Sequence, residues 1–216
     1  MSFVIAVDGP TASGKGTLAR RLAAEFGCAC LDTGALYRAT ALRLIRAGGD
    51  GTDVAAAVAA ARGIDPDDLS DPELRSEATG AMASRVAALQ PVRDALFDYQ
   101  RDFAANPPGG AAGAVLDGRD IGTVVCPDAE AKLFITASAG VRAERRFREL
   151  AAKGTETTLE AVLADLQARD ARDSGRSAAP LRKADDADLL DTTGLDIETA
   201  FSAARALVAA RLKERR

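Results

Sequence analysis

Residues 9–17 read GPTASGKGT and follow the apolar run Phe3–Val7, with Asp8 between them. A buried strand that leads into a glycine-containing turn and then a helix can hold a phosphate, because the backbone N–H groups of the turn and of the helix N-terminus converge on one anion. Lys15 adds a cation that reaches the terminal phosphates of a nucleoside triphosphate. The stretch therefore predicts a P-loop that binds ATP. Its residues are Gly9, Pro10, Thr11, Ala12, Ser13, Gly14, Lys15, Gly16 and Thr17.

The loop departs from the usual Walker pattern at one position. Gly16 follows the lysine, and the hydroxyl comes one place later, at Thr17. In most P-loop proteins the hydroxyl after the lysine binds magnesium directly, so we expect Mg²⁺ to be held here through water. The Gly-Lys-Gly-Thr order resembles that of the nucleoside monophosphate kinases. A glycine turn with a surface lysine is the alternative, which the flanking strand and helix disfavour.

Composition sets outer limits on the class of protein. A chain of 216 residues is the size of one α/β domain with small insertions. Its formal charge of -4 argues against a nucleic acid or an anionic membrane as partner. No apolar run approaches a membrane span, and the N-terminus reads as a core strand, so we expect a cytoplasmic protein. The sequence contains no histidine, which excludes Ser-His and Cys-His hydrolase mechanisms.

The three cysteines, Cys28, Cys30 and Cys126, cannot all pair with one another. Two of them lie in a short apolar segment that reads as a strand. We expect buried thiols, with a metal or redox site as the alternative.

Apolar runs alternate with helical patterns along the chain, which predicts a three-layer α/β/α P-loop fold with a five-stranded parallel sheet. Strands are expected at residues 3–7, 28–31, 114–117, 131–136 and 188–190. Helices are expected at residues 15–26, 35–46, 91–105, 140–153, 158–173 and 197–213. Between residues 47 and 89 the pattern changes to short alanine-rich helices, with Asp71-Pro72 as one helix start. We expect this insertion to carry part of a second binding site.

Three further segments extend the pattern of the P-loop: LDTGALYR at 31–38, LDGRDIGT at 116–123 and RDARDSGR at 169–176. Together with the P-loop they resemble the bacterial cytidylate kinases, in order and over nearly the whole chain. The resemblance implies transfer of the γ-phosphoryl group of ATP to CMP or dCMP, with Mg²⁺, by a monomer. It also implies one kinase domain over 1–216. The core would be residues 1–46, 91–150 and 184–216, the monophosphate-binding insertion 47–90 and a helical lid 151–183.

The resemblance assigns site residues position by position. The catalytic residues would be Lys15, Arg119 and Arg172. The P-loop would bind ATP together with Arg142 and Arg146. The residues implied for CMP are Thr33, Arg38, Ser84, Arg93, Arg119, Asp120, Arg169, Asp173 and Arg176. Asp117 would hold the metal through water, and Asp32 is a weaker metal candidate.

The chemistry of the residues supports these roles, because phosphoryl transfer needs two phosphates held in line and their charge neutralised. Arg38 and Arg119 follow strands that end at the same edge of the sheet, where such folds bind ligands. A solvated helix residue is the alternative for Arg38. Asp117 ends a strand at the Walker B position or caps the next turn, and Asp32 fits an active-site role and a helix N-cap equally.

Two arginine clusters show one-faced helical spacing. Arg169, Arg172, Asp173 and Arg176 form either a salt-bridged solvent surface, which the spacing alone favours, or a phosphate clamp. A break expected at Ser174-Gly175 would let Arg176 move independently and favours the clamp. The second cluster is Arg142, Arg145 and Arg146, which we expect to meet ATP.

Two other functions stay open at this point. One is a P-loop kinase for another small acceptor, such as UMP, dTMP or shikimate. The other is a regulatory nucleotide-binding module, which is disfavoured because the Asn-Lys-x-Asp guanine motif is absent. One departure from the family concerns the insertion, where bacterial cytidylate kinases carry a small antiparallel sheet. Residues 47–89 show no clear alternating strands and look shortened and more helical.

Overall fold

A computed structural model describes residues 3–176 and 179–214 of the chain. The chain divides into two compact units. The first consists of Met1–Leu31 with Ala104–Arg216, and the second is Asp32–Phe103. The expected lid, 151–183, includes residues 177–178, which lie outside the described residues.

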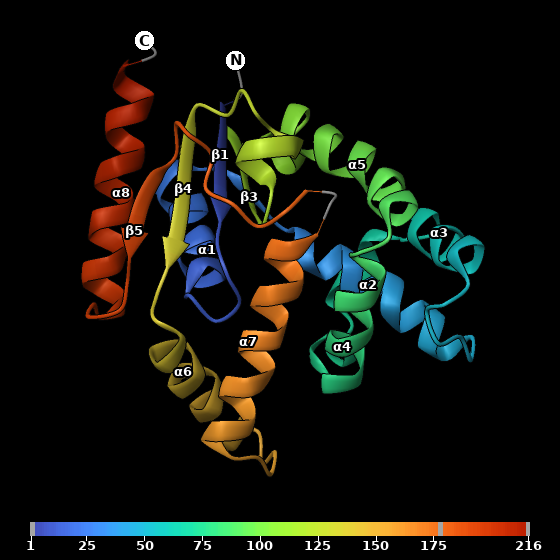
Figure 1. Cartoon of the computed structure of the whole chain (residues 1–216). Helices are drawn as coiled ribbons and strands as arrows, with labels where there is room; N and C mark the ends of the chain where they lie inside the picture. The colour runs from blue at the N-terminus through green and yellow to red at the C-terminus, as the bar shows by residue number, and fades with distance from the viewer. Residues whose placement is uncertain (1–2, 177–178, 215–216) are drawn as a thin grey trace. The chain divides into compact units, whose positions relative to one another are not determined.

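A five-stranded sheet with the order β2-β3-β1-β4-β5 forms the centre of the first unit (Figure 1). Its strands are β1 (Phe3–Asp8), β2 (Ala29–Asp32), β3 (Gly113–Gly118), β4 (Ala131–Thr136) and β5 (Asp188–Asp191). β1 pairs in parallel with β3 and β4, and β4 pairs in parallel with β5. The predicted five-stranded parallel sheet is confirmed, and the P-loop follows its central strand.

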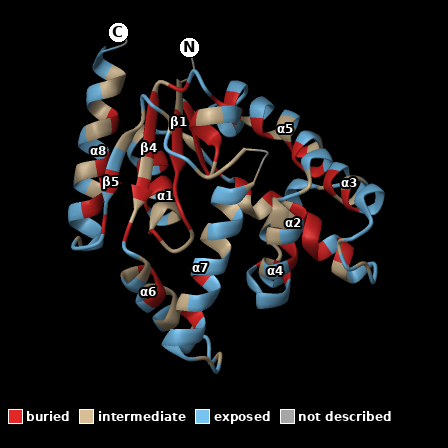
Figure 2. Cartoon of the chain, viewed as in Figure 1, coloured by how far each residue is buried: buried red, intermediate tan, exposed pale blue. Residues whose placement is uncertain are grey.

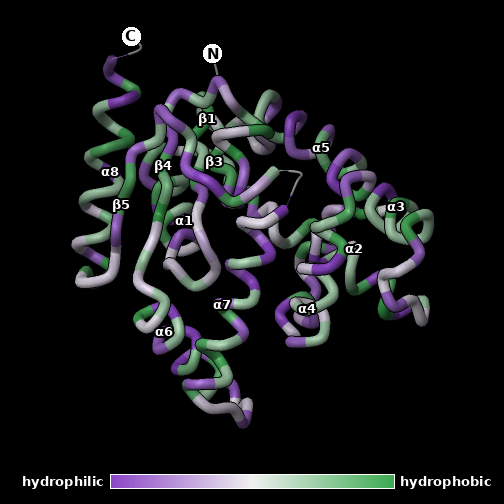
Figure 3. The backbone as a smooth tube through the Cα atoms, viewed as in Figure 1, coloured by the Kyte–Doolittle hydropathy of each residue, from purple (hydrophilic) through white to green (hydrophobic). Residues whose placement is uncertain are grey.

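Helices α1 (Lys15–Phe26) and α8 (Ile197–Glu214) pack together and against the strands of this sheet. The shared core includes Ile5 and Val7 of β1, Leu22 of α1 and Val208 of α8, all fully buried. Burial is concentrated in the strands and on the inner faces of these helices (Figure 2). The hydropathy of the backbone follows the same division, because β1 and β4 are mostly hydrophobic (Figure 3). This packing fixes the strand ends from which the site residues project.

Two helices of the first unit, α6 (Ala139–Ala152) and α7 (Leu159–Gly175), pack on each other around Ala143 and Leu166. The expected break at Ser174-Gly175 is wrong, because α7 continues through both residues and ends at Gly175. Arg176 is the first residue outside the helix. The unit also contains η3 (Pro108–Gly110) and the single π-helical turn η4 (Ile121–Val125).

In the second unit Asp32 ends β2, and residues 33–103, all of which are described, contain helices and no strand. They are α2 (Thr33–Arg46), α3 (Val54–Arg62), η1 (Pro66–Ser70), η2 (Pro72–Arg75), α4 (Glu77–Val86) and α5 (Gln90–Ala105). α2 packs against both α3 and α4. The expectation of short helices without strands is confirmed. Asp71 is the N-cap of η2 and accepts a hydrogen bond from Glu73 N at 2.8 Å, so the expected helix start begins a 3-10 helix.

The expectation of buried cysteines holds only in part. Cys126 is buried, Cys28 is half-buried and Cys30 is exposed, and no disulfide joins them. β2 is an edge strand of the sheet, and residues along it alternate between inward and outward positions, which places Cys30 outside. Desolvation raises the pKa of the Cys28 thiol to about 11. None of the described helices has the length and apolarity needed to cross a membrane.

Candidate active site

The P-loop begins at a position where only glycine fits. Gly9 has φ 149°, and a Cβ there would lie 2.0 Å from the backbone oxygen of Ile135 in β4. Gly14, with φ 89°, is the N-cap of α1. Ser13 is 1% exposed, and its Oγ has no hydrogen-bond partner among the described residues. A buried hydroxyl at a helix N-terminus provides a donor for an anion that the loop encloses.

Lys15 lies beside the carboxylate that ends β3. Its Nζ is 3.6 Å from Oδ1 of Asp117, and the two side chains are 12% and 7% exposed. A Cβ on residue 16 would lie only 3.0 Å from Oδ2 of the same carboxylate. Glycine at position 16 therefore leaves room for Asp117 beside the loop, which explains why the hydroxyl of the Walker pattern is displaced to Thr17.

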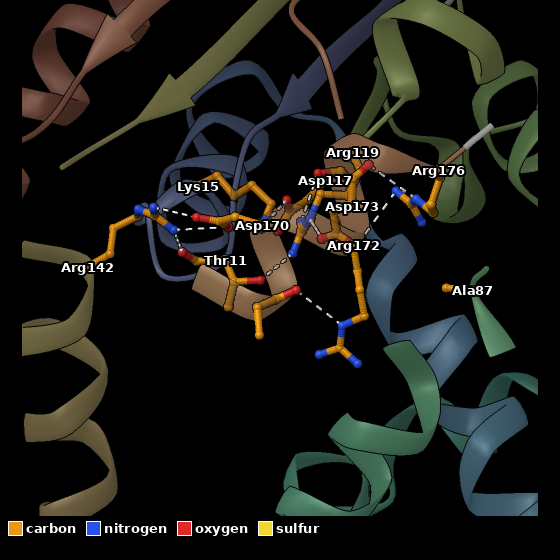
Figure 4. Close-up of polar contacts among 12 residues, drawn as sticks. Thr11, Lys15, Ala87, Asp117, Arg119, Arg142, Asp170, Arg172, Asp173 and Arg176 are labelled. Atoms are coloured by element: carbon orange, nitrogen blue, oxygen red, sulfur yellow. Dashed lines mark hydrogen bonds and ion pairs between the residues drawn. The ribbon is translucent and has the colours of Figure 1, made fainter. Parts of the chain in front are cut away.

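Arg119 connects the loop after β3 to the P-loop (Figure 4). Its Nη2 donates to Oγ1 of Thr11 at 2.8 Å, and its Nε donates to Oδ2 of Asp173 in α7 at 3.1 Å. Nη1 donates to the carbonyl of Gly118 at 3.1 Å. The guanidinium thus donates from each of its three nitrogens to an acceptor that holds it in place, although 22% of the side chain stays exposed.

A second arginine joins α6 and α7 to the P-loop. Arg142 is 5% exposed and makes a two-pronged ion pair with Asp170, with Nη1 3.2 Å from Oδ1 and Nη2 2.6 Å from Oδ2. The same Nη1 donates to the carbonyl of Thr11 at 3.2 Å (Figure 4). Asp170 and Asp173, three residues apart on α7, therefore each bind an arginine that also contacts Thr11.

Asp8, the last residue of β1, is a buried carboxylate next to the loop. Oδ1 accepts a hydrogen bond from Ile121 N at 2.9 Å, and Oδ2 accepts one from Gly122 N at 2.8 Å. Desolvation raises the pKa of Asp8 to about 7. The carboxylates of Asp120 and Asp117 add to this rise, while the two backbone hydrogen bonds oppose it.

A cavity of about 320 Å³ opens beside the P-loop within the first unit. Its lining includes Ser13, Thr17, Arg145, Leu195 and Ile197. Arg145 donates to Oγ1 and to the carbonyl of Thr192, at 3.0 and 2.7 Å, just after β5. The cavity thus has an apolar wall from the start of α8 and a guanidinium on another side, and it borders the loop directly.

The other predicted residues of the first unit have local partners. Arg146 pairs with Glu149 at 2.9 Å on the same helix. Arg172 is exposed and donates to the carbonyl of Ala168 at 3.3 Å. Arg176 donates to the carbonyl of Asp173 at 3.3 Å. Among the remaining residues, Arg169 is partly exposed and Asp120, the N-cap of η4, is 6% exposed.

The second unit holds the other residues predicted to bind the monophosphate. Arg38 of α2 pairs at 3.5 Å with Asp32, which lies six residues earlier at the start of the helix. Asp32 is the N-cap residue of α2, but its side chain makes no capping hydrogen bond. Arg93 is 8% exposed, and its guanidinium lies over the ring of Tyr37, 5.6 Å from the centroid.

Two further predicted residues lie in this unit. Thr33, at the start of α2, is 3% exposed, and Ser84, in α4, is partly exposed.

Sequence reasoning missed several contacts of the P-loop. Asp8, Asp170 and Thr192 were not among the predicted residues, although each binds a backbone or side chain that holds the loop or its neighbours. For Asp8 a signal existed, because it is a charged residue at the end of an otherwise apolar strand, directly before Gly9. For Thr192 nothing in the sequence indicated a role.

An anion-binding loop on the central strand of a parallel sheet, with a lysine, a carboxylate and an arginine gathered at it, defines a phosphotransferase of the P-loop class. A family model described as cytidylate kinase matches residues 5–209. The chain belongs to the cytidylate kinase family.

Relatives named cytidylate kinase support this assignment over nearly the full length. The protein of Paramagnetospirillum magneticum is 57% identical, covering 96% of this chain and 98% of its own. The protein of Xanthobacter autotrophicus is 59% identical, covering 97% and 98%. The protein of Rhodospirillum rubrum is 55% identical, covering 96% and 97%.

Solved structures that resemble the chain are distant in sequence and bear on the fold alone. An uncharacterized protein from Eubacterium ventriosum matches with a TM-score of 0.56 at 15% identity, covering 97% of this chain and 99% of its own. A sugar kinase from Janibacter matches with a TM-score of 0.50 at 14% identity, covering 97% and 95%.

Proposed function

We propose that the protein transfers the γ-phosphoryl group of ATP to CMP or dCMP, giving ADP and CDP or dCDP. The family match and relatives more than half identical support this activity. The structural observation that carries it is the hydrogen bond from Arg119 to Thr11. It brings a cation from the loop after β3 to the loop that binds the donor phosphates. A protein that only bound a nucleotide would have no need for this second cation at its triphosphate.

On the donor side, the P-loop residues 9–17 bind the phosphates of ATP, and Lys15 neutralises the charge that moves with the γ-phosphoryl group. The cavity beside the loop takes the nucleoside of the donor, and Arg145 and Ile197 are among the residues that line it. Arg142 and Arg146 are also assigned to the donor. Arg142 supports the loop through the Thr11 carbonyl, and it would act on ATP from that position.

On the acceptor side, arginines bind the phosphate and polar groups read the nucleoside. We assign Arg119 and Arg176 of the first unit and Arg38 of the second to the phosphate of CMP. Arg169 and Asp173 are assigned to the sugar, and Arg172 to the transferring group. The residues assigned to the base and its surroundings are Thr33, Ser84, Arg93 and Asp120.

Mg²⁺ fits one group in the first unit. The Asp117 carboxylate is buried, lies 3.6 Å from Lys15 and borders the space that a side chain on residue 16 would fill. Asp117 would hold the ion through bound water, and Asp32 is the weaker candidate. When bound, the ion supplies positive charge to the donor phosphates.

The residues of the chain would act by position and charge. The P-loop backbone and Lys15 fix the γ-phosphoryl group, while Arg119 holds the acceptor oxygen in line with it. Arg119 and Arg172 then offset negative charge that spreads over the transferring group. We further propose that the enzyme works as a monomer in the cytoplasm, where ATP and CMP are available to it.

A coupled assay of ADP release tests the proposal directly. The protein with ATP and Mg²⁺ would be given CMP, dCMP, UMP, dTMP and shikimate in separate reactions. CMP or dCMP is expected to give the highest kcat/KM, and chelation of Mg²⁺ is expected to stop turnover. A higher kcat/KM for UMP, dTMP or shikimate would assign another acceptor, and ATP binding without turnover of any acceptor would indicate a regulatory module.

A further inference from the structure

Asp8 joins two parts of the site that are far apart in the sequence. It ends the central strand β1 directly before Gly9, and its carboxylate accepts from two consecutive backbone N–H groups, those of Ile121 and Gly122. The side chain is buried, with 5% of the residue exposed. One carboxylate therefore fixes the backbone of the loop after β3 at two adjacent positions.

The residues that this carboxylate fixes lie next to the proposed acceptor residues. Arg119 and Asp120 immediately precede Ile121, and Asp120 is the N-cap residue of η4. The side chain of an N-cap residue usually binds the first N–H groups of its helix, but that of Asp120 makes no such bond. Asp8 binds these N–H groups from another strand instead.

Close packing around Gly122 leaves this arrangement little freedom. A Cβ on residue 122 would lie 3.4 Å from Oδ2 of Asp8 and 3.1 Å from Cδ of Lys132 in β4. Glycine at this position lets the loop pack closely on the Lys132 side chain while its N–H group donates the 2.8 Å hydrogen bond to Asp8. A displaced loop would also move Arg119 away from Thr11 in the P-loop.

We propose that Asp8 is a positioning residue for phosphoryl transfer: it holds residues 119–122 in register with the P-loop, and so places Arg119 and Asp120 for the acceptor. This inference rests on the proposed function, in which those two residues bind CMP. It predicts that the effect of losing Asp8 falls on the acceptor and not on the donor, because the P-loop itself keeps Gly9, Lys15 and their contacts.

The variant Asp8→Asn tests the role with little change in size. An amide keeps one acceptor oxygen, but its NH₂ group would face the second N–H group, so one of the two hydrogen bonds is lost and two donors oppose each other. In the full-length enzyme, kcat/KM for CMP should fall by roughly tenfold or more. The ratio of kcat/KM for CMP over UMP should fall as well, whereas KM for ATP should change by less than about threefold.

Val208→Ala is the matched control. Val208 is fully buried in α8, in the core of the same unit and away from the loop. Its truncation should lower stability in urea, as Asp8→Asn is expected to do, yet leave the CMP-to-UMP ratio and both KM values as in the wild type. A folded Asp8→Asn enzyme with wild-type kcat/KM for CMP and a wild-type ratio would overturn the proposal. A parallel rise in KM for ATP and CMP would overturn it too.

A second variant decides the matter if Asp8→Asn does not fold. Gly122→Ala leaves the carboxylate in place and crowds the loop against the Lys132 side chain, so that the loop must shift on Asp8. It should therefore reduce the same ratio, and an unchanged ratio would refute the role. The wild type separates the two proposals. If the wild type does not phosphorylate CMP, the proposed function fails. If the wild type is active and Asp8→Asn has the same kcat/KM for CMP and the same CMP-to-UMP ratio, only the positioning role is overturned.

Discussion

Replacing Arg119 by methionine should separate catalysis from stability more cleanly than any other change at the site. Methionine keeps a long, flexible side chain but removes the guanidinium and with it the hydrogen bond to Thr11 and the ion pair with Asp173. A hydrogen bond to a charged group contributes about 1.5–3 kcal/mol. Two such bonds to a phosphate in the transition state therefore amount to roughly 4 kcal/mol, or about 10³-fold in kcat/KM for CMP.

The structure predicts a much smaller effect on folding. The ion pair between Arg119 and Asp173 is mostly buried, with side chains 22% and 16% exposed, but Asp173 keeps a second cation. Nη2 of Arg176 lies 3.9 Å from its Oδ1. We therefore expect the free energy of unfolding to fall by only about 1–2 kcal/mol, measured in urea.

The assay is ADP release with ATP saturating and CMP varied, and then with CMP saturating and ATP varied. Arg148→Met removes the same charge from a side chain that is 74% exposed and pairs with Glu144 one turn away on α6. This control should stay within about twofold of the wild type. A loss of less than tenfold in Arg119→Met, or an equal rise in KM for ATP and CMP, would refute the placement of Arg119 at the acceptor phosphate.

Three further predictions follow from the site. Lys15→Ala should lower kcat by about 10²-fold or more with an unchanged fold by circular dichroism, because Lys15 acts on transition-state charge; near-normal turnover would contradict the P-loop assignment. Asp120→Ala should reduce kcat/KM for CMP more than for UMP, since a carboxylate can accept from the amino group of cytosine but meets a carbonyl in uracil; equal losses would mean that the base is read elsewhere. The pKa of Asp8 rises from 3.8 to about 7 on folding, so the folded state holds this proton more tightly than the unfolded state. Its contribution to stability is therefore full below about pH 3.8 and is lost as the pH rises through 7. Urea unfolding at pH 5 and pH 8 should show that the free energy of unfolding falls more between the two pH values for the wild type than for Asp8→Asn. An equal fall in the two proteins would contradict the raised pKa of Asp8.

The sequence predicted those parts of the fold whose cause is local. The apolar run before Gly9 and the glycines around Lys15 determine a strand, a turn and a helix by themselves, and α1 has the predicted bounds. The predicted bounds of the five strands agree with the observed bounds to within about one residue. Continuous apolar runs that end at a glycine or a charged residue leave few other positions for a strand to begin and end. The break at Ser174-Gly175 was wrong because neither residue forbids a helix, and α7 includes both before it ends at Gly175.

Contacts between distant segments could not be predicted in the same way. The pairing of Asp8 with the N–H groups of residues 121 and 122 depends on β1 lying beside β3, with Asp8 opposite Gly118. A pattern of residue types shows where strands are but not which side chains meet across them. The absence of a side chain at Gly16 looked like a family variation in the sequence, and only the position of Asp117 gave it a steric reason.

The face of α7 that carries the charged residues illustrates what the structure adds to spacing. From the spacing alone, Arg169, Arg172 and Asp173 fit a salt-bridged surface exposed to solvent. In the structure two carboxylates of this helix hold arginines that contact the P-loop, because Asp170 binds Arg142 and Asp173 binds Arg119. Since both arginines also contact Thr11, α7 reaches the loop through two carboxylate–arginine pairs. A phosphate that takes the Nε edge of Arg119 would displace the Asp173 carboxylate from this guanidinium. We therefore expect occupation of the acceptor site to release Asp173 for the sugar of CMP, which couples binding of the phosphate to recognition of the nucleoside.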